Sequence, residues 1–394
     1  MTDRNAPSEV MTPVDGQQLA MALNAASMAR RATVISGGGT KIGWGRTPAR
    51  VDLVINTSKL DVVTHRYGDL TATLGAGATL AAVNGELARH NQWLPFDSAF
   101  DDATIGGLVA TNDSGPLRHR FGTPRDRLLG VTLAMTDGRL VKAGGTVVKN
   151  VAGYDLGRLI SGSFGTLAAI ETATFKLAPL PAASGSLRAR YADGVAFCRA
   201  AQALSESRLD LTAFEVHAAF APGDAAVWHL LVRVASSPAA TEAQLAAAKA
   251  MTGDGTEPTR GEQEAILWRN QVRAPWEGTG ATVRLSWRPA DLTSVLSLIE
   301  SVHRRLDVPV VLTGRIGAGA GALRIDGSPP AQVAAIEHLR SSPLVGHVVV
   351  LRADPVVKES TDVWGPMPGA VRVMHAIKQK LDPAGILNAG RGPI

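Results

Sequence analysis

Three glycine-dense stretches constrain this chain more than any other feature. The first, Gly37-Gly38-Gly39-Thr40-Lys41, directly follows a β-type apolar run at residues 32–35. Consecutive glycines allow positive φ angles and can turn several backbone N–H groups toward one point. Such a concavity binds phosphate, and Lys41 adds a positive charge. An ordinary glycine-rich turn explains these five residues equally well, because they match neither the GxGxxG nor the Walker spacing.

The second stretch is residues 104–115 (TIGGLVATNDSG), and the third lies within residues 149–177 (KNVAGYDLGRLISGSFGTLAAIETATFKL). Small side chains keep the second stretch flat enough for a planar ligand, with close helix-to-sheet packing as the alternative explanation. In the third stretch, Asp155 is placed to cap a short helix that reaches residue 160, and residues 161–166 form a tight turn. The three stretches together predict a large anionic cofactor held against bare backbone.

Composition limits the class of protein. The chain has 394 residues, enough for two or three domains, and its 41 glycines with only 5% aromatic residues are typical of close α/β backbone packing. Its single cysteine, Cys198, excludes an internal disulfide and an iron–sulfur cluster held by this chain alone. The net charge of +5 comes from scattered residues, so no nucleic-acid partner is expected. Without a long apolar run or a signal-peptide pattern, the expected location is cytoplasmic.

Local patterns predict the elements of a first domain at residues 14–181, preceded by a flexible tail at residues 1–13. They include a helix at 16–30, a strand at 64–75 and a helix capped by Thr79. Asp137-Gly138, between two apolar runs, is a strong hairpin signal. Pro179 and Pro181 mark the end of this domain.

The rest of the chain predicts a second domain and a C-terminal segment. Strands alternate with helices over residues 187–352, which favours an α+β sheet covered on one face. This region lacks glycine loops of the first kind and is interpreted as a cap. Residues 353–394 contain an irregular loop at 364–369 and an amphipathic helix at 371–381. The fold class predicted for the whole chain is α+β.

This combination resembles the FAD-binding fold of the vanillyl-alcohol oxidase (VAO) / p-cresol methylhydroxylase (PCMH) family. The likeness covers residues 33–177 and returns at residues 382–391. KNVAGYDLGRLISGSFGTLAAI is similar to the KxxxGYDLxxLxxGSxGTLGxI segment of the glycolate oxidase and D-lactate dehydrogenase branch, and LDPAGILNAGR to its closing DPxGIxNPGR. The likeness is greatest to the shorter, FAD-binding subunit of bacterial glycolate oxidases. Ala168 and Ala389 depart from the Gly and Pro of the family pattern.

The resemblance implies a two-subdomain PCMH/VAO-type FAD-binding domain, an α+β cap, and a C-terminal segment that packs back on the FAD domain. It also implies non-covalent FAD, because the glycine loop has no histidine and Cys198 lies in the cap. The residues that it places around the cofactor fall into four groups. These are Gly37, Gly38, Gly39, Thr40 and Lys41 at the pyrophosphate; Gly106, Gly107, Ala110, Asn112 and Gly115 along the ribityl chain and ring; Tyr154, Asp155, Gly165 and Ile170 near the adenine half or pyrophosphate; and Asn388 beneath the isoalloxazine.

The cap departs further from the family. The catalytic branch carries a His-x-Gly-x-Gly-x-x-His segment, but here the aligned residues 313–324 (TGRIGAGAGALR) keep the glycines without a histidine. A 2-hydroxy-acid oxidase needs a base near the substrate hydroxyl or a polarising metal. No metal site is expected, and the catalytic residues stay unknown. The weak candidates are His375 as a base and Arg118, Arg120, Arg269 and Arg315 as carboxylate binders, each of which could equally be a surface charge.

Three hypotheses about function remain open. The first is a flavoenzyme subunit of a glycolate oxidase complex, oxidising glycolate or a related 2-hydroxy acid such as D-lactate. The second is a flavin-carrying partner subunit without a complete active site, and the third is a stand-alone alcohol or sugar oxidase of the same fold. The resemblance implies a hetero-oligomer with a homologous larger flavin subunit and an iron–sulfur subunit, at most peripheral to the membrane. Trp364 could be a contact in that assembly, or it could pack against the C-terminal helix.

Overall fold

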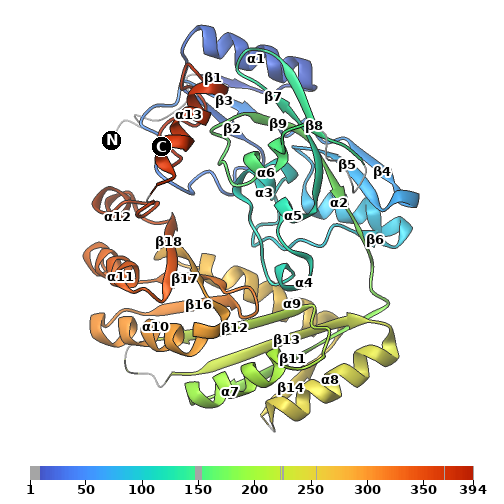
Figure 1. Cartoon of the computed structure of the whole chain (residues 1–394), viewed down its shortest axis with the longest axis vertical. Helices are drawn as coiled ribbons and strands as arrows, with labels where there is room; N and C mark the ends of the chain where they lie inside the picture. Colours follow the sequence, from blue (N-terminus) through green and yellow to red (C-terminus); the bar gives the residue numbers. More distant parts are fainter. Residues whose placement is uncertain are drawn as a thin grey trace. The chain divides into compact units, whose positions relative to one another are not determined.

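The structure is a computed structural model that describes residues 9–146, 153–221, 223, 226–253, 255–367 and 369–393. The chain divides into two compact units. The first takes residues from Met1–Ser114, Gly122–Leu180 and Met367–Ile394, and the second from Gly115–Phe121 and Pro181–Pro366 (Figure 1). The α+β class predicted from the sequence is confirmed. No helix among the described residues is long and apolar enough to span a membrane.

A small parallel sheet and one helix begin the first unit. The sheet has the order β1-β3-β2, formed by Glu9–Met11, Leu53–Asn56 and Thr33–Ser36. The helix α1, Gly16–Met28, is capped by Asp15, whose side chain accepts a hydrogen bond from the Gln18 backbone N–H at 2.8 Å. The predicted tail at residues 1–13 is thus wrong in part. Residues 9–11 are a strand because they pair with β3, while residues 1–8 lie outside the described part.

A five-stranded antiparallel sheet forms the second layer of this unit. Its order is β4 (Val63–Arg66), β5 (Thr71–Gly75), β9 (Ala169–Lys176), β7 (Leu128–Ala134) and β8 (Leu140–Gly144). The helices of this unit also include α2 (Leu80–Leu87), α3 (Ile105–Thr111), α5 (Pro124–Arg127) and α6 (Leu156–Ile160). Two short strands, β6 (Gln92–Trp93) and β10 (Ala178–Pro179), pair with each other. The predicted Asp137-Gly138 hairpin and the predicted caps Thr79 and Asp155 are confirmed.

One eight-stranded sheet is the centre of the second unit, and all its strand pairs are antiparallel. The order is β14 (Thr256–Thr259), β11 (Ala183–Tyr191), β13 (Trp228–Ser236), β12 (Ala213–Phe220), β16 (Val310–Arg315), β17 (Ala320–Ile325), β15 (Ala281–Trp287) and β18 (Val345–Arg352). The short helix α4, Arg118–Phe121, belongs to this unit although the residues on either side of Gly115–Phe121 belong to the first.

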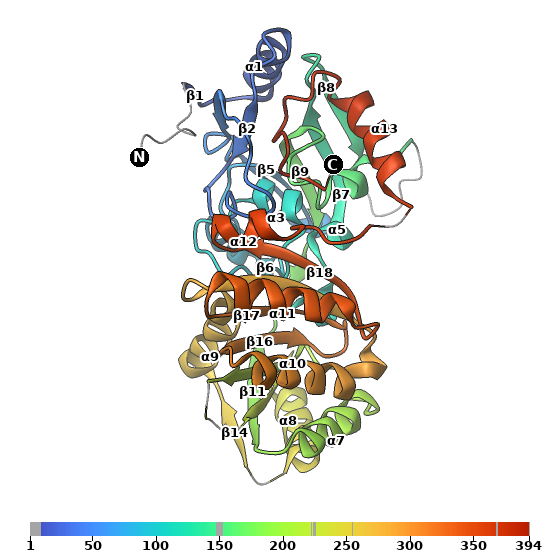
Figure 2. The ribbon, with the colours of Figure 1, turned by 90° about the vertical axis from the view of Figure 1, so that its left-hand side faces the viewer.

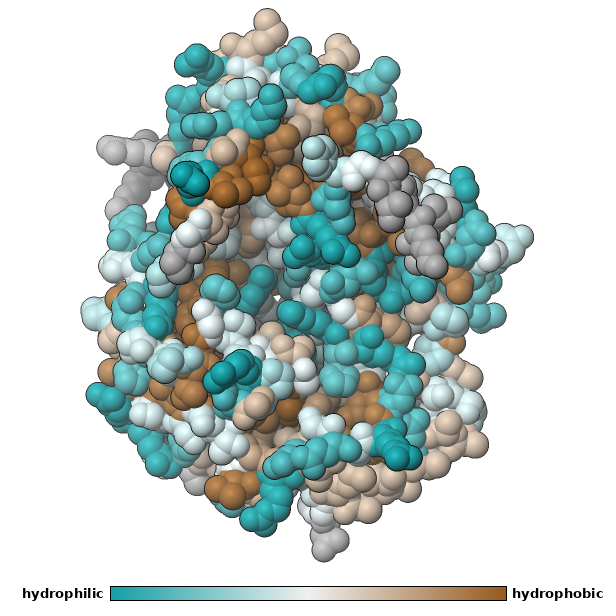
Figure 3. Space-filling view, viewed as in Figure 1, coloured by the Kyte–Doolittle hydropathy of each residue, from teal (hydrophilic) through white to brown (hydrophobic). Residues whose placement is uncertain are grey.

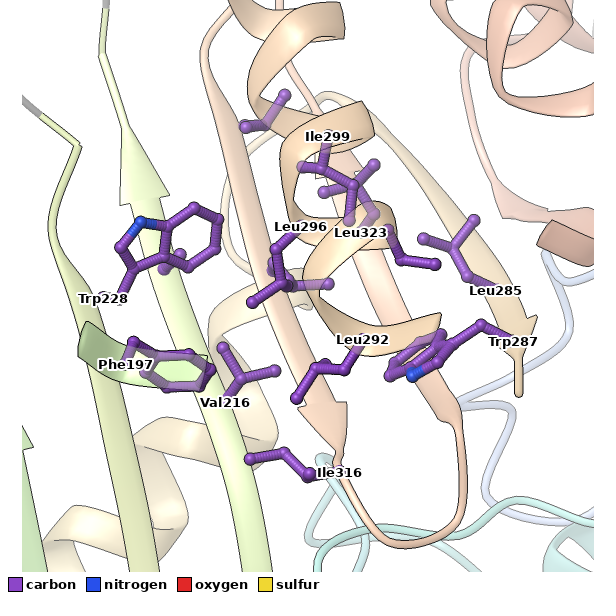
Figure 4. Packing of buried hydrophobic residues seen from close by; sticks show 14 of the residues in the cluster. Phe197, Val216, Trp228, Leu285, Trp287, Leu292, Leu296, Ile299, Ile316 and Leu323 are labelled. Carbon is purple, nitrogen blue, oxygen red and sulfur yellow. The ribbon is translucent and has the colours of Figure 1, made fainter. Parts of the chain in front are cut away.

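Helices pack on both faces of this sheet. On one face lie α7 (Gly194–Ser205), α8 (Pro238–Thr252), α10 (Leu292–Leu306) and α11 (Pro329–Ser341); Figure 2 shows α10 and α11 in front of β16. Their apolar side chains form one core with the strands, in which Phe197, Trp228 and Leu296 are buried (Figure 4). On the other face α9, Gly261–Arg273, packs Trp268 against Ala213 and Leu231. The prediction of a sheet covered on one face is therefore wrong where α9 lies.

The C-terminal segment divides between the two units. Helix α12, Pro355–Ser360, and Trp364 belong to the second unit, whereas α13, Val371–Leu381, and the residues after it belong to the first. Trp364 is half-buried against the core of the second unit. The segment predicted at residues 353–394 thus returns to the first unit only from Met367, and the functional domain boundaries stay a prediction.

Candidate cofactor site

A pocket with an empty volume of about 690 Å³, part of which is open to solvent, lies within the first unit. Four segments supply most of its lining. They are the end of β2 with the glycine loop that follows, helix α3, the turn after α6, and the segment after α13. Segments far apart in the sequence thus meet at one cavity.

Either a close contact or the backbone conformation explains why each of the three positions in the first loop is a glycine. A Cβ on Gly37 would lie 2.3 Å from Thr104 Oγ1, and a Cβ on Gly38 would lie 2.0 Å from the backbone oxygen of Asp102. Gly39 has φ +69°, a left-handed conformation that glycine adopts without strain. The loop therefore lies against residues 102–104 with bare backbone on the pocket side.

The start of α3 approaches the backbone of another strand. Thr104 caps the helix by accepting from the Gly107 N–H at 3.4 Å, and the Gly106 N–H donates to the Ala76 carbonyl at 2.8 Å. A Cβ on Gly106 would lie 2.9 Å from the Ala76 Cβ. Close packing thus requires Gly106, and the same lack of a side chain leaves room for a ligand. Ligand binding and close packing, the two explanations for this stretch, are both compatible with this geometry.

The turn after α6 closes another side of the pocket. The Phe164 N–H donates to the Ala110 carbonyl at 2.8 Å, which ties the turn to α3. Phe164 and Gly165 both have positive φ, +56° and +69°. A Cβ on Gly165 would lie 2.6 Å from Asn388 Nδ2, so the turn leaves space only for glycine there.

Asn388 joins two of these segments. Its Nδ2 donates to the Phe164 carbonyl at 2.6 Å and its Oδ1 accepts from the Ile35 N–H at 3.3 Å. The residue is 1% exposed and has φ +43°. A short polar side chain that tolerates the left-handed region is thus needed, and asparagine has both properties.

Arg391 holds the outer part of the glycine loop. Its Nε donates to the Trp44 carbonyl at 2.9 Å, and its Nη2 donates to the Lys41 carbonyl. Burial lowers the pKa of Arg391 to about 10. At neutral pH the guanidinium keeps its charge and adds positive potential to the pocket.

A partly buried ion pair fixes the segment that carries Asn388 and Arg391. Lys378 Nζ lies 2.5 Å from Asp382 Oδ2 and also donates to the carbonyls of Thr166 and Leu387, at 2.7 and 3.1 Å. Asp382 accepts in turn from the Leu387 N–H at 2.8 Å. These contacts connect α13 to the turn that follows it and to the turn between α6 and β9, which contains Thr166.

Two polar atoms in the pocket fit a bound anionic or hydrogen-bonding ligand. Lys41 Nζ and Ser163 Oγ are buried and have no hydrogen-bond partner among the described residues. Lys41 is 5% exposed, and its nearest opposite charge is Asp113, with Nζ and Oδ2 3.4 Å apart. Buried polar atoms are normally hydrogen-bonded, so two such donors beside bare backbone indicate a ligand with oxygen acceptors.

Most of the predicted cofactor residues line this pocket. They are Gly37, Gly38, Gly39, Thr40, Lys41, Gly106, Gly107, Ala110, Gly165, Ile170 and Asn388. The other four do not. Asn112 ends α3 and accepts from the Arg125 N–H at 3.2 Å, Tyr154 is 91% exposed, Asp155 caps α6, and Gly115 belongs to the second unit. Residues 149–152 of the third glycine stretch lie outside the described part.

The catalytic candidates do not line this pocket. His375 is exposed on α13. The four arginines belong to the second unit, where Arg269 is exposed on α9 and Arg120 pairs with Asp210. Arg315 Nε lies 3.3 Å from Oε1 of the fully buried Glu215, so its charge is already compensated. Arg118, on α4, stays a candidate on the sequence alone.

Several residues that line the pocket were missed by the sequence reasoning, among them Thr104, Ser163, Phe164 and Arg391. Thr104 precedes the Gly-Gly pair at the position of a helix N-cap. Ser163 lies in the tight turn already singled out, and Arg391 ends the closing motif. Phe164 carried no signal, because its positive φ is set by the contact with Ala110.

Comparisons with known proteins agree with this geometry. Residues 7–144 match the family model described as "FAD binding domain", and residues 366–391 match the one described as "FAD linked oxidases, C-terminal domain". Both matches contribute residues to the pocket. The second covers the segment after α13 that holds Asn388 and Arg391.

Three curated relatives bear the names of 2-hydroxy-acid enzymes. The D-lactate dehydrogenase of Archaeoglobus fulgidus is 33% identical over 43% of this chain and 38% of its own length. Glycolate oxidase subunit GlcE of Escherichia coli is 34% identical over 44% of this chain and 49% of its own length. The D-2-hydroxyglutarate dehydrogenase of Xanthomonas citri pv. viticola is 27% identical over 98% of this chain and 89% of its own length. The aligned region is thus less than half of the first two relatives and most of the third.

Solved structures share the fold. Alkyldihydroxyacetonephosphate synthase has a TM-score of 0.71 at 14% identity, covering 97% of this chain and 75% of the other. The Bermuda grass isoallergen BG60 has a TM-score of 0.70 at 13% identity, covering 98% and 90%.

A chain with this pocket and these matched domains is a flavoprotein. It contains an FAD binding domain and the C-terminal domain of FAD linked oxidases, and its cofactor is FAD. These matches agree with the resemblance seen in the sequence and confirm the cofactor expected from it. The structure fits FAD because the glycine loop, Lys41 and Ser163 offer a bare-backbone cradle and two donors to its pyrophosphate and hydroxyl oxygens.

We expect the FAD to be bound without a covalent bond. Covalent anchors in flavoproteins are nucleophilic side chains, and the described residues that line the pocket include no His, Cys or Tyr. After acid precipitation, the flavin should be recovered in the supernatant as FAD on chromatography. Flavin that stays with the precipitate, or recovery of FMN, would contradict the expectation.

Proposed function

We propose that this chain oxidises 2-hydroxy acids to 2-oxo acids with FAD as the electron acceptor, as the FAD-binding subunit of a glycolate oxidase-type complex. The observation that carries the proposal is the FAD pocket itself, in a chain whose relatives are named for glycolate, D-lactate and D-2-hydroxyglutarate. Each of these three substrates is a 2-hydroxy carboxylate.

The residues of this chain carry out only part of the proposed reaction. Oxidation of a 2-hydroxy acid removes two electrons and two protons, and bound FAD supplies the acceptor for the hydride equivalent. Gly37, Gly38 and Gly106 would let the cofactor approach the backbone, and Lys41 and Arg391 would supply positive charge beside it. The base that takes the hydroxyl proton is not assigned, because no histidine occurs among the described residues of the pocket lining.

The subunit role rests on likeness to a named subunit, glycolate oxidase subunit GlcE. We propose as partners a homologous larger flavin subunit and an iron–sulfur subunit, since one cysteine cannot ligate a cluster. α13 exposes Val371 and Val373, and apolar side chains gather on the upper part of this face, over the first unit (Figure 3). This surface is a better contact candidate than Trp364, which is half-buried in its own unit.

A second candidate function, a flavin-carrying partner without a complete active site, is favoured by one hairpin. Strands β16 and β17 hold the glycine-rich segment that aligns with the histidine-bearing segment of the catalytic branch. A Cβ on Gly314 would lie 2.9 Å from Trp287 Cη2, and one on Gly321 would lie 2.6 Å from the Thr313 carbonyl oxygen. Packing within the second unit therefore accounts for these glycines without a catalytic role.

Co-expression tests the subunit role. We expect pull-down of this chain to recover the larger flavin subunit and the iron–sulfur subunit, and glycolate:acceptor activity to require all three. Omitting each subunit in turn is the control. Full activity of this chain by itself would contradict the subunit role and favour a stand-alone oxidase.

A further inference from the structure

The ammonium group of Lys41 is enclosed by side chains of the first unit. Lys41 ends the glycine loop and is 5% exposed. Its Nζ lies 5.8 Å from the ring centroid of Trp44 and 5.6 Å from that of Phe100, and the two rings meet edge-on with their centroids 6.4 Å apart. An aromatic face attracts a cation through its quadrupole and does not take up the N–H groups as an oxygen acceptor would. The rings therefore hold the charge and leave its donors for another group.

Asp113 supplies the opposite charge from the end of α3. Its Oδ2 lies 3.4 Å from Lys41 Nζ, and the two side chains are 14% and 5% exposed. Asn112 before it has φ +45°, which turns the chain so that the Asp113 N–H donates to the Leu108 carbonyl at 3.2 Å. This helix cap fixes the position of Asp113 within the first unit, independently of Lys41.

The ion pair compensates the charge of Lys41 but not its hydrogen-bonding capacity. Lys41 Nζ lines the cofactor pocket, is buried, and has no hydrogen-bond partner among the described residues. An ammonium group is a donor only, and phosphate oxygens are strong acceptors for charge-assisted hydrogen bonds. A pyrophosphate in this pocket would therefore compete with Asp113 for the Lys41 charge and would also satisfy its N–H groups.

We propose that Asp113 is an exchangeable counter-ion of Lys41, which the FAD pyrophosphate replaces when the cofactor binds. Before binding, the carboxylate stabilises the buried ammonium group, because an unpaired buried charge is strongly destabilising. The same carboxylate lowers the affinity for FAD, because its negative charge opposes that of the pyrophosphate. The proposal rests on the FAD site and is independent of the substrate proposed above.

Asp113→Asn separates these two effects because they have opposite signs. The substitution keeps the size of the side chain and the backbone hydrogen bond to Leu108, and removes the negative charge. We expect the apoprotein to unfold several degrees lower, and its dissociation constant for FAD to fall about tenfold. Thermal unfolding of the apoprotein and titration of flavin fluorescence measure the two quantities. A purely structural role of Asp113 would lower stability and affinity together.

Two further variants calibrate this result. Asp69→Asn is the matched control, because it removes the same charge from an exposed residue of the first unit outside the pocket lining. It should bind FAD like the wild type. Lys41→Met should raise the dissociation constant about tenfold or more, since it removes the donor itself.

Ionic strength gives an independent reading of the charge balance. Salt should weaken FAD binding more steeply in Asp113→Asn than in the wild type, because Lys41 then has no carboxylate to compensate its charge. An FAD dissociation constant of Asp113→Asn that equals or exceeds the wild-type value would overturn the proposal. If the apoprotein does not refold after removal of its flavin, the rate of FAD release from the holoprotein replaces the titration. Slower release than from the wild type then supports the exchange, and equal or faster release contradicts it.

Discussion

Gly38→Val should lower the affinity for FAD by at least about a hundredfold, or about 3 kcal/mol. A Cβ at this position would lie 2.0 Å from the Asp102 carbonyl oxygen, so the loop must move away from residues 102–104. That movement displaces Gly39 and Lys41, which line the pocket beside it. Of these glycines, Gly39 has a positive φ and Gly38 does not, so the contact with Asp102 alone constrains Gly38.

The control for this prediction is Gly43→Val, a few residues along the same loop. A Cβ on Gly43 would have no heavy atom within 4 Å. We expect this variant to keep its flavin. Flavin content per protein and far-UV circular dichroism should be measured for both variants, and the second unit of Gly38→Val should stay folded. Full FAD occupancy in Gly38→Val would remove this residue from the site.

Elements whose signals are local were predictable from the sequence. Thr79 and Asp155 cap helices, and Asp137-Gly138 forms the hairpin between β7 and β8. Each signal depends on the conformation of a few adjacent residues, so no tertiary contact is needed to read it. By contrast, residues 64–75 were predicted to be one strand and form two, β4 and β5. The chain turns between them at Leu70, which has φ +52° and a side chain that gives no turn signal.

Long-range contacts explain what the sequence could not predict about the site. The glycines of the pocket could be predicted because two closely packed backbone segments leave no room for a Cβ, wherever they lie in the chain. Phe164 was missed since its conformation depends on Ala110, and the partners of Arg391 lie more than 300 residues earlier in the chain. The assignment of residues 115–121 to the second unit likewise reflects contacts between distant segments, such as those of His119 with Gly317 and Phe214, which no local pattern encodes.

Anaerobic reduction of the bound flavin by a 2-hydroxy acid is the second large effect that we expect. Oxidised FAD should lose its visible absorbance when glycolate, D-lactate or D-2-hydroxyglutarate is added to the assembled complex. The cofactor should accept two electrons per substrate molecule oxidised. L-lactate and acetate, which lack the D configuration or the hydroxyl group, serve as controls that should leave the spectrum unchanged.

The most direct test of the 2-hydroxy-acid proposal is this spectral titration, performed on the FAD-loaded chain alone and again with its partner subunits. Bleaching by at least one of the three acids, with the matching 2-oxo acid formed in equal amount, is the predicted result. Bleaching that needs the partners would assign this chain the role of a flavin-carrying subunit. A flavin that a chemical reductant bleaches but none of the three acids reduces, with or without partners, would contradict the proposed function.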